Sequence, residues 1–278
     1  MKGKTSTAIR MTLLIILALV MSYPLLWLLA SSFKSDNEIY SSFTLIPKEI
    51  TFEGYRSGWK GIRNLNFLVF IGNTFKLVLP TVFFTIIASV TVGYGFGRFE
   101  FPLKKFLFWI MLSSLMLPGT VLIIPRYIIF RNLGWIDSFL PFYIPALLGC
   151  YPFFIFMMIQ FIRGMPRELD ESAIIDGCNS FTILVRILIP LMKPAIFSVA
   201  IFQFIWTWNS FFDVLIYVSS TDKFPIALAL RMYTDVMTSG GINRILAMTV
   251  LSILPSIYIF FSAQKYFIEG IATTGIKG

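Results

Sequence analysis

The sequence predicts an all-α polytopic membrane protein with six transmembrane helices and a cytoplasmic helix–turn–helix loop between spans four and five. The first observation behind this prediction is composition. Of the 278 residues, 57% are hydrophobic and only 13% are charged, whereas an ordinary soluble domain is about 45–50% apolar and about 25% charged. The second observation is six charge-free stretches that each reach the roughly 20 residues a helix needs to cross a bilayer. Together they exclude a soluble enzyme.

The predicted spans follow these charge-free stretches and form one transmembrane domain over residues 1–278. They comprise residues 11–30, 77–97, 106–125, 138–162, 194–213 and 245–264, of which the fifth adds Asp213 to the charge-free run 194–212. Strands of a lipid-embedded barrel would be shorter and would alternate in polarity, which these stretches do not. The first stretch exceeds the roughly 7–15 apolar residues of a signal peptide, and no small-residue cleavage site follows it. We therefore expect an uncleaved first helix.

The charge around the first span predicts the orientation. Lys2, Lys4 and Arg10 precede it without an acidic residue, which favours a cytoplasmic N-terminus. Six spans then place both termini in the cytoplasm. The 23 lysines and arginines of the whole chain divide almost evenly between the two sides. In so apolar a chain, the net charge of +9 points to lipid headgroups in the bilayer, with no nucleic acid as a partner.

Several kinds of chemistry are not expected. Histidine is absent, which excludes Ser-His-Asp catalysis and His-ligated zinc. Gly3-Lys4-Thr5 resembles the end of a phosphate loop, but the motif needs an earlier glycine for which the chain starts too late. We therefore expect no catalytic residue, no metal site and no cofactor bound by this chain.

The third observation is the long polar segment at residues 163–193, predicted to be cytoplasmic. Pro166 suits the first turn of one short helix, and Gly177 suits its left-handed stop. Asn179 or Ser180 can cap a second helix. The second helix carries one apolar stripe at helical spacing, formed by Phe181, Leu184, Val185 and Leu188. The segment is thus predicted to fold as two helices joined by a tight turn.

This segment resembles the loop that marks the membrane subunits of binding-protein-dependent ABC importers, E-A-A-x3-G-x9-I-x-L-P. The matching residues are Glu171-Ser172-Ala173, Gly177, Ile187 and Ile189-Pro190. Ser172 and Ile189 depart from the pattern but keep similar size or polarity. Three more segments resemble the maltose-importer type of permease: Tyr94 with Arg98-Phe99-Glu100-Phe101-Pro102, Trp208-Asn209 with Phe211, and the tail Gln264-Lys265-Tyr266-Phe267 with Gly270 and Gly275-Ile276-Lys277-Gly278.

The resemblance implies a permease of a sugar or oligosaccharide importer in a bacterial or archaeal cell (inner) membrane. Its partners would be a second homologous permease in a heterodimer, two cytoplasmic ATPase subunits that hold ATP and Mg, and an extracytoplasmic solute-binding protein. It also implies which residues couple this chain to the ATPase: Glu171, Ser172, Ala173, Asp176, Gly177, Ile187 and Pro190.

Span five is the candidate for the substrate pathway, through Trp208, Asn209, Ser210 and Asp213. A carboxylate within a span usually faces a partner or a water-filled cavity, although Asp213 can also sit at the outer boundary of the bilayer. Aromatic residues here, Trp206, Trp208 and Tyr217, can stack on a sugar or form an interfacial belt. Both alternatives stay open.

Three other functions compete with the sugar importer. The chain could import another small solute by the same mechanism. It could instead be a self-sufficient channel or an ion-coupled carrier, which would have no reason to build an ATPase dock. A membrane enzyme would need an activated nucleophile or metal ligands, which the sequence does not offer. Conduction in liposomes that contain no ATPase would distinguish the channel from the importer.

Overall fold

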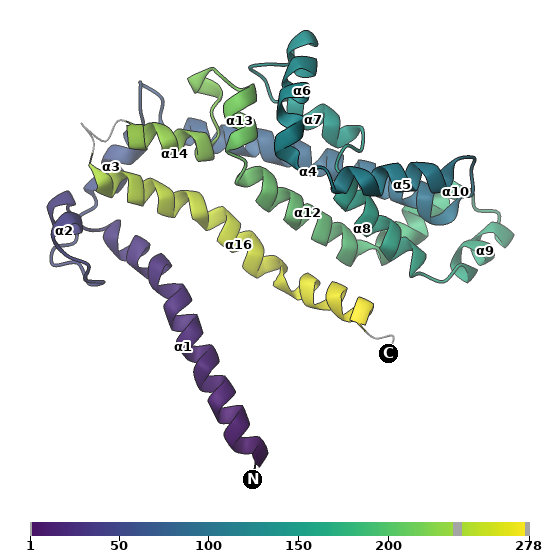
Figure 1. The fold of residues 1–278 in the computed structure, drawn as a ribbon, viewed down its shortest axis with the longest axis horizontal. Helices are drawn as coiled ribbons and strands as arrows, with labels where there is room; N and C mark the ends of the chain where they lie inside the picture. The colour runs from purple at the N-terminus through teal and green to yellow at the C-terminus, as the bar shows by residue number, and fades with distance from the viewer. Residues whose placement is uncertain (1, 236–240, 276–278) are drawn as a thin grey trace. The chain divides into compact units, whose positions relative to one another are not determined.

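The computed structural model describes residues 2–235 and 241–275, and among them the protein is helical (Figure 1). The first half of the chain contains α1 (Lys2–Ser31), α2 (Asp36–Ser41), α3 (Glu53–Lys60), α4 (Phe67–Arg98), α5 (Lys104–Leu115), α6 (Gly119–Asn132) and α7 (Leu140–Leu147). The second half contains α8 (Pro152–Arg163), α9 (Glu168–Ile175), α10 (Ser180–Thr182), the π-helix η1 (Ile183–Leu188), α11 (Ile189–Leu191), α12 (Lys193–Trp208), α13 (Phe212–Tyr217), the 3₁₀-helix η2 (Thr221–Lys223), α14 (Ile226–Asp235) and α16 (Ile242–Gly275). These helices confirm the predicted all-α class.

Four described helical segments are long and apolar enough to cross a membrane: Ile9–Ser31, Phe67–Arg98, Ile242–Ser262 and Leu140–Arg163, which combines α7 and α8. Two further pairs reach that length only together. Lys104–Leu115 with Gly119–Asn132 is bent by 106°, and Ser180–Leu191 with Lys193–Trp208 is bent by 77°. Counting each pair as one span gives up to six, which is the predicted number, but the second pair then includes Ser180–Leu191, which the sequence placed in the cytoplasmic segment 163–193.

The predicted third span, 106–125, is not one straight helix. Proline at 118 lacks an N–H and disfavours helical geometry in the residue before it. Helix α5 accordingly ends at Leu115, and Pro118 stands in an extended conformation immediately before α6. The predicted fifth span, 194–213, also differs, because α12 ends at Trp208 and α13 begins only at Phe212.

The predicted fourth span, 138–162, contains a turn between α7 and α8. Gly149 has a φ of +74°, and the N–H of Cys150 donates to the carbonyl of Pro145 over 2.8 Å. This is a Schellman stop, in which a left-handed glycine lets the chain satisfy the last carbonyls of a helix. Pro152 then starts α8, since a proline fits the first turn of a helix.

The chain divides into two compact units, whose boundaries fall within α4, α14 and α16. The first unit contains Met1–Ile71 and Leu228–Pro255. Its core surrounds Tyr233, which is fully buried, packs edge-on against Phe67 and donates its hydroxyl to the carbonyl of Gly58 over 2.7 Å. A Cβ at Gly58 would lie 2.6 Å from Met248 Cε, so glycine allows this close approach.

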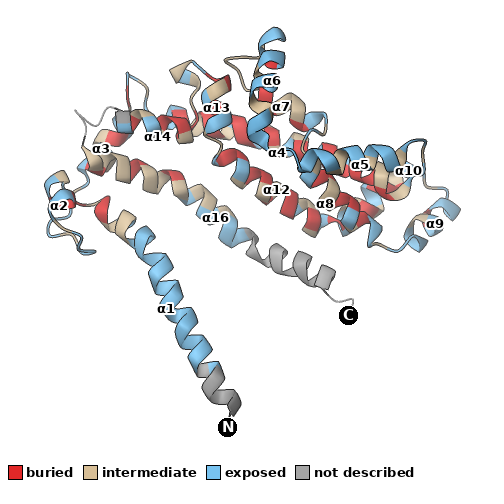
Figure 2. Cartoon of the chain, viewed as in Figure 1, coloured by how far each residue is buried: buried red, intermediate tan, exposed pale blue. Residues whose placement is uncertain are grey.

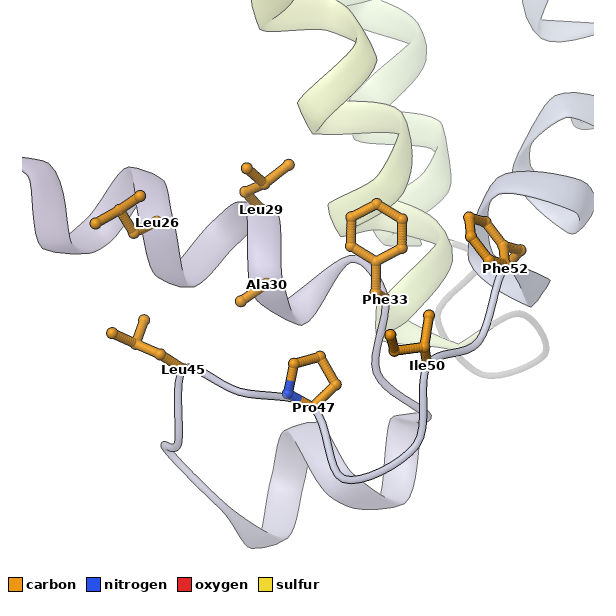
Figure 3. A pocket seen from close by; sticks show the side chains of 8 residues that line it. All are labelled: Leu26, Leu29, Ala30, Phe33, Leu45, Pro47, Ile50 and Phe52. Atoms are coloured by element: carbon orange, nitrogen blue, oxygen red, sulfur yellow. The ribbon is translucent and has the colours of Figure 1, made fainter.

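Helix α1 packs little within its own unit. None of its most apolar 18-residue window is buried, and it is exposed along most of its length in Figure 2. Its last turns and the following loop enclose an apolar pocket of about 520 Å³ (Figure 3). The lining residues are Leu26, Leu29, Ala30, Phe33, Leu45, Pro47, Ile50 and Phe52. An apolar helix exposed in this way is suited to lipid or to another membrane chain.

The second unit contains Gly72–Ala227 and Ser256–Gly278. In its core, the end of α4 and one face of α8 pack against the part of the chain that runs from α9 to α12. Its buried members are Val90, Tyr94, Phe154, Met158, Ile162, Ala173, Ile183, Leu184, Leu188, Met192, Ala195 and Val199. The predicted helix–turn–helix segment is therefore seated on this core and does not project freely into solvent.

Candidate functional site

The segment between α8 and α12 forms the predicted pair of helices with a tight turn. Helix α9 ends in a Schellman stop, in which Gly177 has a φ of +82° and the N–H of Cys178 donates to the carbonyl of Ala173 over 2.9 Å. Asn179 caps the second helix by accepting the N–H of Thr182 at 2.8 Å. Both the positive φ at Gly177 and the cap at Asn179 confirm predictions from the sequence.

The predicted apolar stripe of the second helix is only half buried. Leu184 and Leu188 are buried, but Phe181 is 73% exposed and Val185 is 41% exposed. The reason is that residues Ile183–Leu188 form a π-helix, whose i→i+5 hydrogen bonds widen the turn. Ile183, at 2% exposure, therefore joins Leu184 and Leu188 on the buried face.

The predicted coupling residues divide into exposed and buried positions. Glu171, Ser172, Asp176, Gly177 and Pro190 are exposed, Ile187 is half-buried, and Ala173 is buried. Ser172 replaces the usual small apolar residue without disrupting the helix, because its hydroxyl donates to the carbonyl of Glu168 one turn earlier.

This segment exposes a surface whose acidic side chains form no ion pair with other described residues. Among the described residues, neither Glu171 nor Asp176 forms an ion pair. Large apolar side chains lie on the same two helices and are also exposed, namely Ile174 at 61%, Ile175 at 87%, Phe181 and Val185. We call this set, with Glu171 and Asp176, the loop surface. Such a mixed surface is typical of a protein–protein contact.

Arg98 anchors the loop to the end of α4, and sequence reasoning did not assign it a site role. Its Nη1 and Nη2 donate to the carbonyls of Met165 at 3.1 Å and Pro166 at 3.3 Å. Its Nε lies 3.0 Å from Asp170 Oδ2, with side-chain exposures of only 7% and 16%. One turn earlier, the Tyr94 hydroxyl donates to the Ser180 carbonyl over 3.1 Å. The motif that contains Tyr94 and Arg98 is visible in the sequence, but the sequence does not show that this motif contacts the loop.

The four predicted pathway residues do not share one site. Trp208 is buried, where it stacks on Phe204 at 5.1 Å and meets Phe75 edge-on at 5.3 Å. Asn209 turns back to donate to the carbonyl of Ile205 over 2.8 Å, and Ser210 is half-buried. Asp213, by contrast, lines a cavity.

That cavity lies among α6, α7, the turn that precedes α8, and α13, and it has a volume of about 310 Å³. Its polar lining comes from Arg126, Tyr151, Asp213 and Tyr217, and its aromatic lining includes Phe130 and Phe142. Tyr217, which the sequence suggested as a stacking residue, is held edge-on by Phe130 at 5.3 Å and by Phe142 at 5.9 Å. We call this site the α6–α13 cavity.

Close to this cavity, Asp137 fixes the loop after α13. Its carboxylate accepts the backbone N–H groups of Ser219 at 3.0 Å and Ser220 at 2.8 Å, and the Ser220 hydroxyl at 2.6 Å. Lys223 Nζ donates to the same carboxylate over 2.7 Å. The hydrogen bond from Lys223, followed by that from the Ser220 hydroxyl, holds the pKa of Asp137 well below its usual range.

Comparison with known proteins gives the family. Residues 89–272 match the family described as binding-protein-dependent transport system inner membrane component. The chain belongs to this family. It is thus a multi-pass membrane permease subunit of a transport system.

Curated relatives of the permease agree over nearly the whole chain. The arabinooligosaccharides transport permease AraQ of Bacillus subtilis is 32% identical over 267 residues, which cover 94% of this chain and 92% of the relative. AraQ of Halalkalibacterium halodurans is 30% identical over 288 residues, covering all of both chains. A probable ABC transporter permease of Bacillus subtilis, YurM, is 30% identical over 277 residues, covering 99% of this chain and 89% of the relative.

A solved structure shares the fold. The permease is similar to a chain in the crystal structure of a bacterial ABC transporter involved in the import of the acidic polysaccharide alginate, with a TM-score of 0.84. The identity is 22%, over 96% of this chain and 98% of that one. The tail residues of the resemblance, 264–278, lie outside the part of the permease whose side chains the structure describes.

Proposed function

We propose that the permease is one membrane subunit of an ATP-driven importer of sugars or oligosaccharides. The names of its relatives support this cargo class, because they include transporters of arabinooligosaccharides, galactooligosaccharides and diacetylchitobiose. The single observation that carries the mechanism is the loop surface, because it exposes acidic and large apolar side chains on a well-anchored helix pair. An isolated channel would have no use for such a surface.

In this proposal the loop surface lies in the cytoplasm and binds a separate ATPase subunit. Glu171 and Asp176 would meet basic or backbone donors there, while Ile175 and Phe181 would be buried on contact. ATP and Mg would be held by two such ATPase subunits, and this chain would bind neither. Both termini of the permease would then also be cytoplasmic, in a bacterial or archaeal cell membrane.

The same proposal includes a second homologous permease and an extracytoplasmic solute-binding protein. Contact with a second membrane chain is supported by α1, whose apolar side chains remain exposed within the chain; a heterodimer is the form that the family resemblance implies. Covering this helix with a second membrane chain would replace lipid contacts by packed side-chain contacts.

The decisive experiment replaces Gly177 by aspartate in the assembled transporter. Gly177 holds a φ of +82° and has open space around its missing Cβ, so the substitution strains the turn and adds a charge without a buried clash. We expect the permease to insert normally, to lose its ATPase during co-purification, and to lose sugar uptake. Normal ATPase retention together with normal uptake would show that the energy enters elsewhere.

Gly134 provides a matched control. It also has a positive φ, +70°, and a Cβ added to it would have no neighbouring atom within 4 Å, but it follows α6 and is remote in sequence from the loop surface. Gly134→Asp should carry the same backbone strain and the same charge and still retain the ATPase. Ion conduction by the wild-type permease in liposomes without an ATPase would instead support the channel alternative.

A further inference from the structure

The α6–α13 cavity contains polar groups that the rest of the chain does not use. Arg126 and Asp213 both line it, yet neither forms an ion pair or a side-chain hydrogen bond among the described residues. The hydroxyl groups of Tyr151 and Tyr217 likewise have no hydrogen-bond partner in the described part of the chain. Asp137, which lies in the same unit, satisfies its carboxylate with four donors.

The charge of these groups limits what the cavity can bind. One guanidinium and one carboxylate give the lining no net charge, so a simple anion would meet Asp213 and a simple cation would meet Arg126. A neutral ligand with many hydroxyl groups can satisfy both, since it accepts from arginine and donates to the carboxylate. The two tyrosine hydroxyls can do either.

The aromatic lining adds a preference for ligands with apolar faces. Tyr217 and Phe130 are fixed by their edge-on contact at 5.3 Å, so little side-chain entropy is lost when a ligand packs against them. Sugar rings combine apolar C–H faces with hydroxyl groups around the edge. The cavity volume of about 310 Å³ is at the lower end of the range for small-molecule sites, about 300–1,000 Å³. This volume suits one saccharide unit better than a whole oligosaccharide.

We infer that the α6–α13 cavity is a subsite of this permease for one neutral saccharide unit, bound through Arg126, Asp213, Tyr151 and Tyr217. The inference rests on the proposed function, and it adds that this subunit itself contacts the cargo. It also separates Asp213 from the other predicted pathway residues, because Trp208 and Asn209 are engaged within the helices.

The first test is transport by the complete complex in proteoliposomes. Arabinotriose, galactotriose and N,N′-diacetylchitobiose are offered to the wild type to find a transported sugar. Arg126→Gln, Asp213→Asn and Tyr217→Phe should then each reduce its uptake by about tenfold or more, since each removes a hydrogen-bonding group from the ligand. The amount of assembled complex, measured by size-exclusion chromatography, controls for folding.

Matched controls are available close by in the chain. Arg131→Gln removes an exposed arginine from the same helix, α6, and Asp222→Asn removes an exposed acid from the loop after α13. Neither residue lines the cavity, so both variants should transport at the wild-type rate. Equal uptake by the cavity variants and these controls would overturn the inference. Absence of any sugar transport by the wild type would instead contradict the proposed function.

The second test reads binding directly through Cys150, which lines the cavity and is exposed. In a complex that carries Cys178→Ser, labelling of Cys150 by a maleimide should slow severalfold when the transported sugar is present at saturating concentration. The protection should disappear with Asp213→Asn. Undiminished labelling would overturn the inference, as would protection by a zwitterion such as glutamine and by none of the sugars.

Discussion

The guanidinium of Arg98 at the end of α4 lies 3.0 Å from the carboxylate of Asp170 in α9, with both side chains largely shielded from solvent. The same guanidinium donates to the carbonyls of Met165 and Pro166. One arginine thus connects a membrane-spanning helix to the start of the loop surface. This contact is a direct link between α9 and α4.

Replacing Arg98 by alanine should therefore loosen the loop. It leaves Asp170 partly buried without its counter-charge, and removal of one partner of a buried ion pair typically costs about 3–5 kcal/mol. We expect a lower unfolding temperature of the solubilised complex and faster trypsin cleavage at Arg167, which is exposed. Arg98→Lys should recover only part of the stability, because an ammonium group cannot replace the fork of donors.

The Glu100–Lys104 ion pair is the control for that experiment. It joins residues four apart at the start of α5 over 2.9 Å, and its acid is 78% exposed. Exposed pairs of this kind contribute little to stability. Glu100→Gln should leave both the unfolding temperature and the trypsin cleavage rate unchanged. A comparable loss in both variants would contradict the anchoring role of Arg98.

Gly177→Ala tests the backbone contribution of the loop turn apart from charge. A Cβ there meets open space, whereas at Gly97 it would lie 2.6 Å from Ile162 Cγ2. The left-handed φ should cost about 1 kcal/mol at Gly177, and Gly97→Ala should cost more because the side-chain core must move. Equilibrium denaturation of the solubilised complex measures both. A larger loss at Gly177 than at Gly97 would contradict this assignment.

The Asp137 network should lose its stabilising effect in acid. Its pKa is depressed in the folded state, so its contribution is fully present above the unfolded-state pKa, about 3.9, and declines as the pH falls toward the folded-state pKa. Asp137→Asn should lower the unfolding temperature at pH 7, and the difference from wild type should narrow below about pH 4. Asp222→Asn should show no such trend. A difference that is constant from pH 7 to pH 3 would exclude the ionised carboxylate as its source.

Single cysteines can establish the orientation. Ile50 is 70% exposed and Ser180 is exposed at the start of α10. In a background with Cys150 and Cys178 replaced by serine, an impermeant maleimide applied to intact cells should label Ile50→Cys and should not label Ser180→Cys until the membrane is permeabilised. Labelling of Ser180→Cys in intact cells would overturn both the cytoplasmic placement of the loop surface and the ATPase proposal.

Local chemistry was enough to predict much of the fold. The apolar stretches are visible in the sequence because they depend only on composition and length. Gly177 ends one helix because glycine readily adopts a left-handed backbone conformation. Asn179 begins the next helix because its side chain caps it. The family resemblance rested on the loop that contains these two residues and on three further segments. In each of these cases the relevant interactions lie within a few residues along the chain, so they can be read from the sequence.

The tertiary structure decided what depends on distant segments meeting. The contact of Arg98 with Asp170 and the meeting of Arg126, Tyr151 and Asp213 in one cavity require particular helices to pack side by side, which no periodicity specifies. The same holds for the exposure of Phe181, since the π-helix that follows it rotates the buried face. Sequence alone indicated the apolar segments and the helix stop and cap of the loop, and packing determined where the spans are interrupted and which side chains remain free to bind a partner or a ligand.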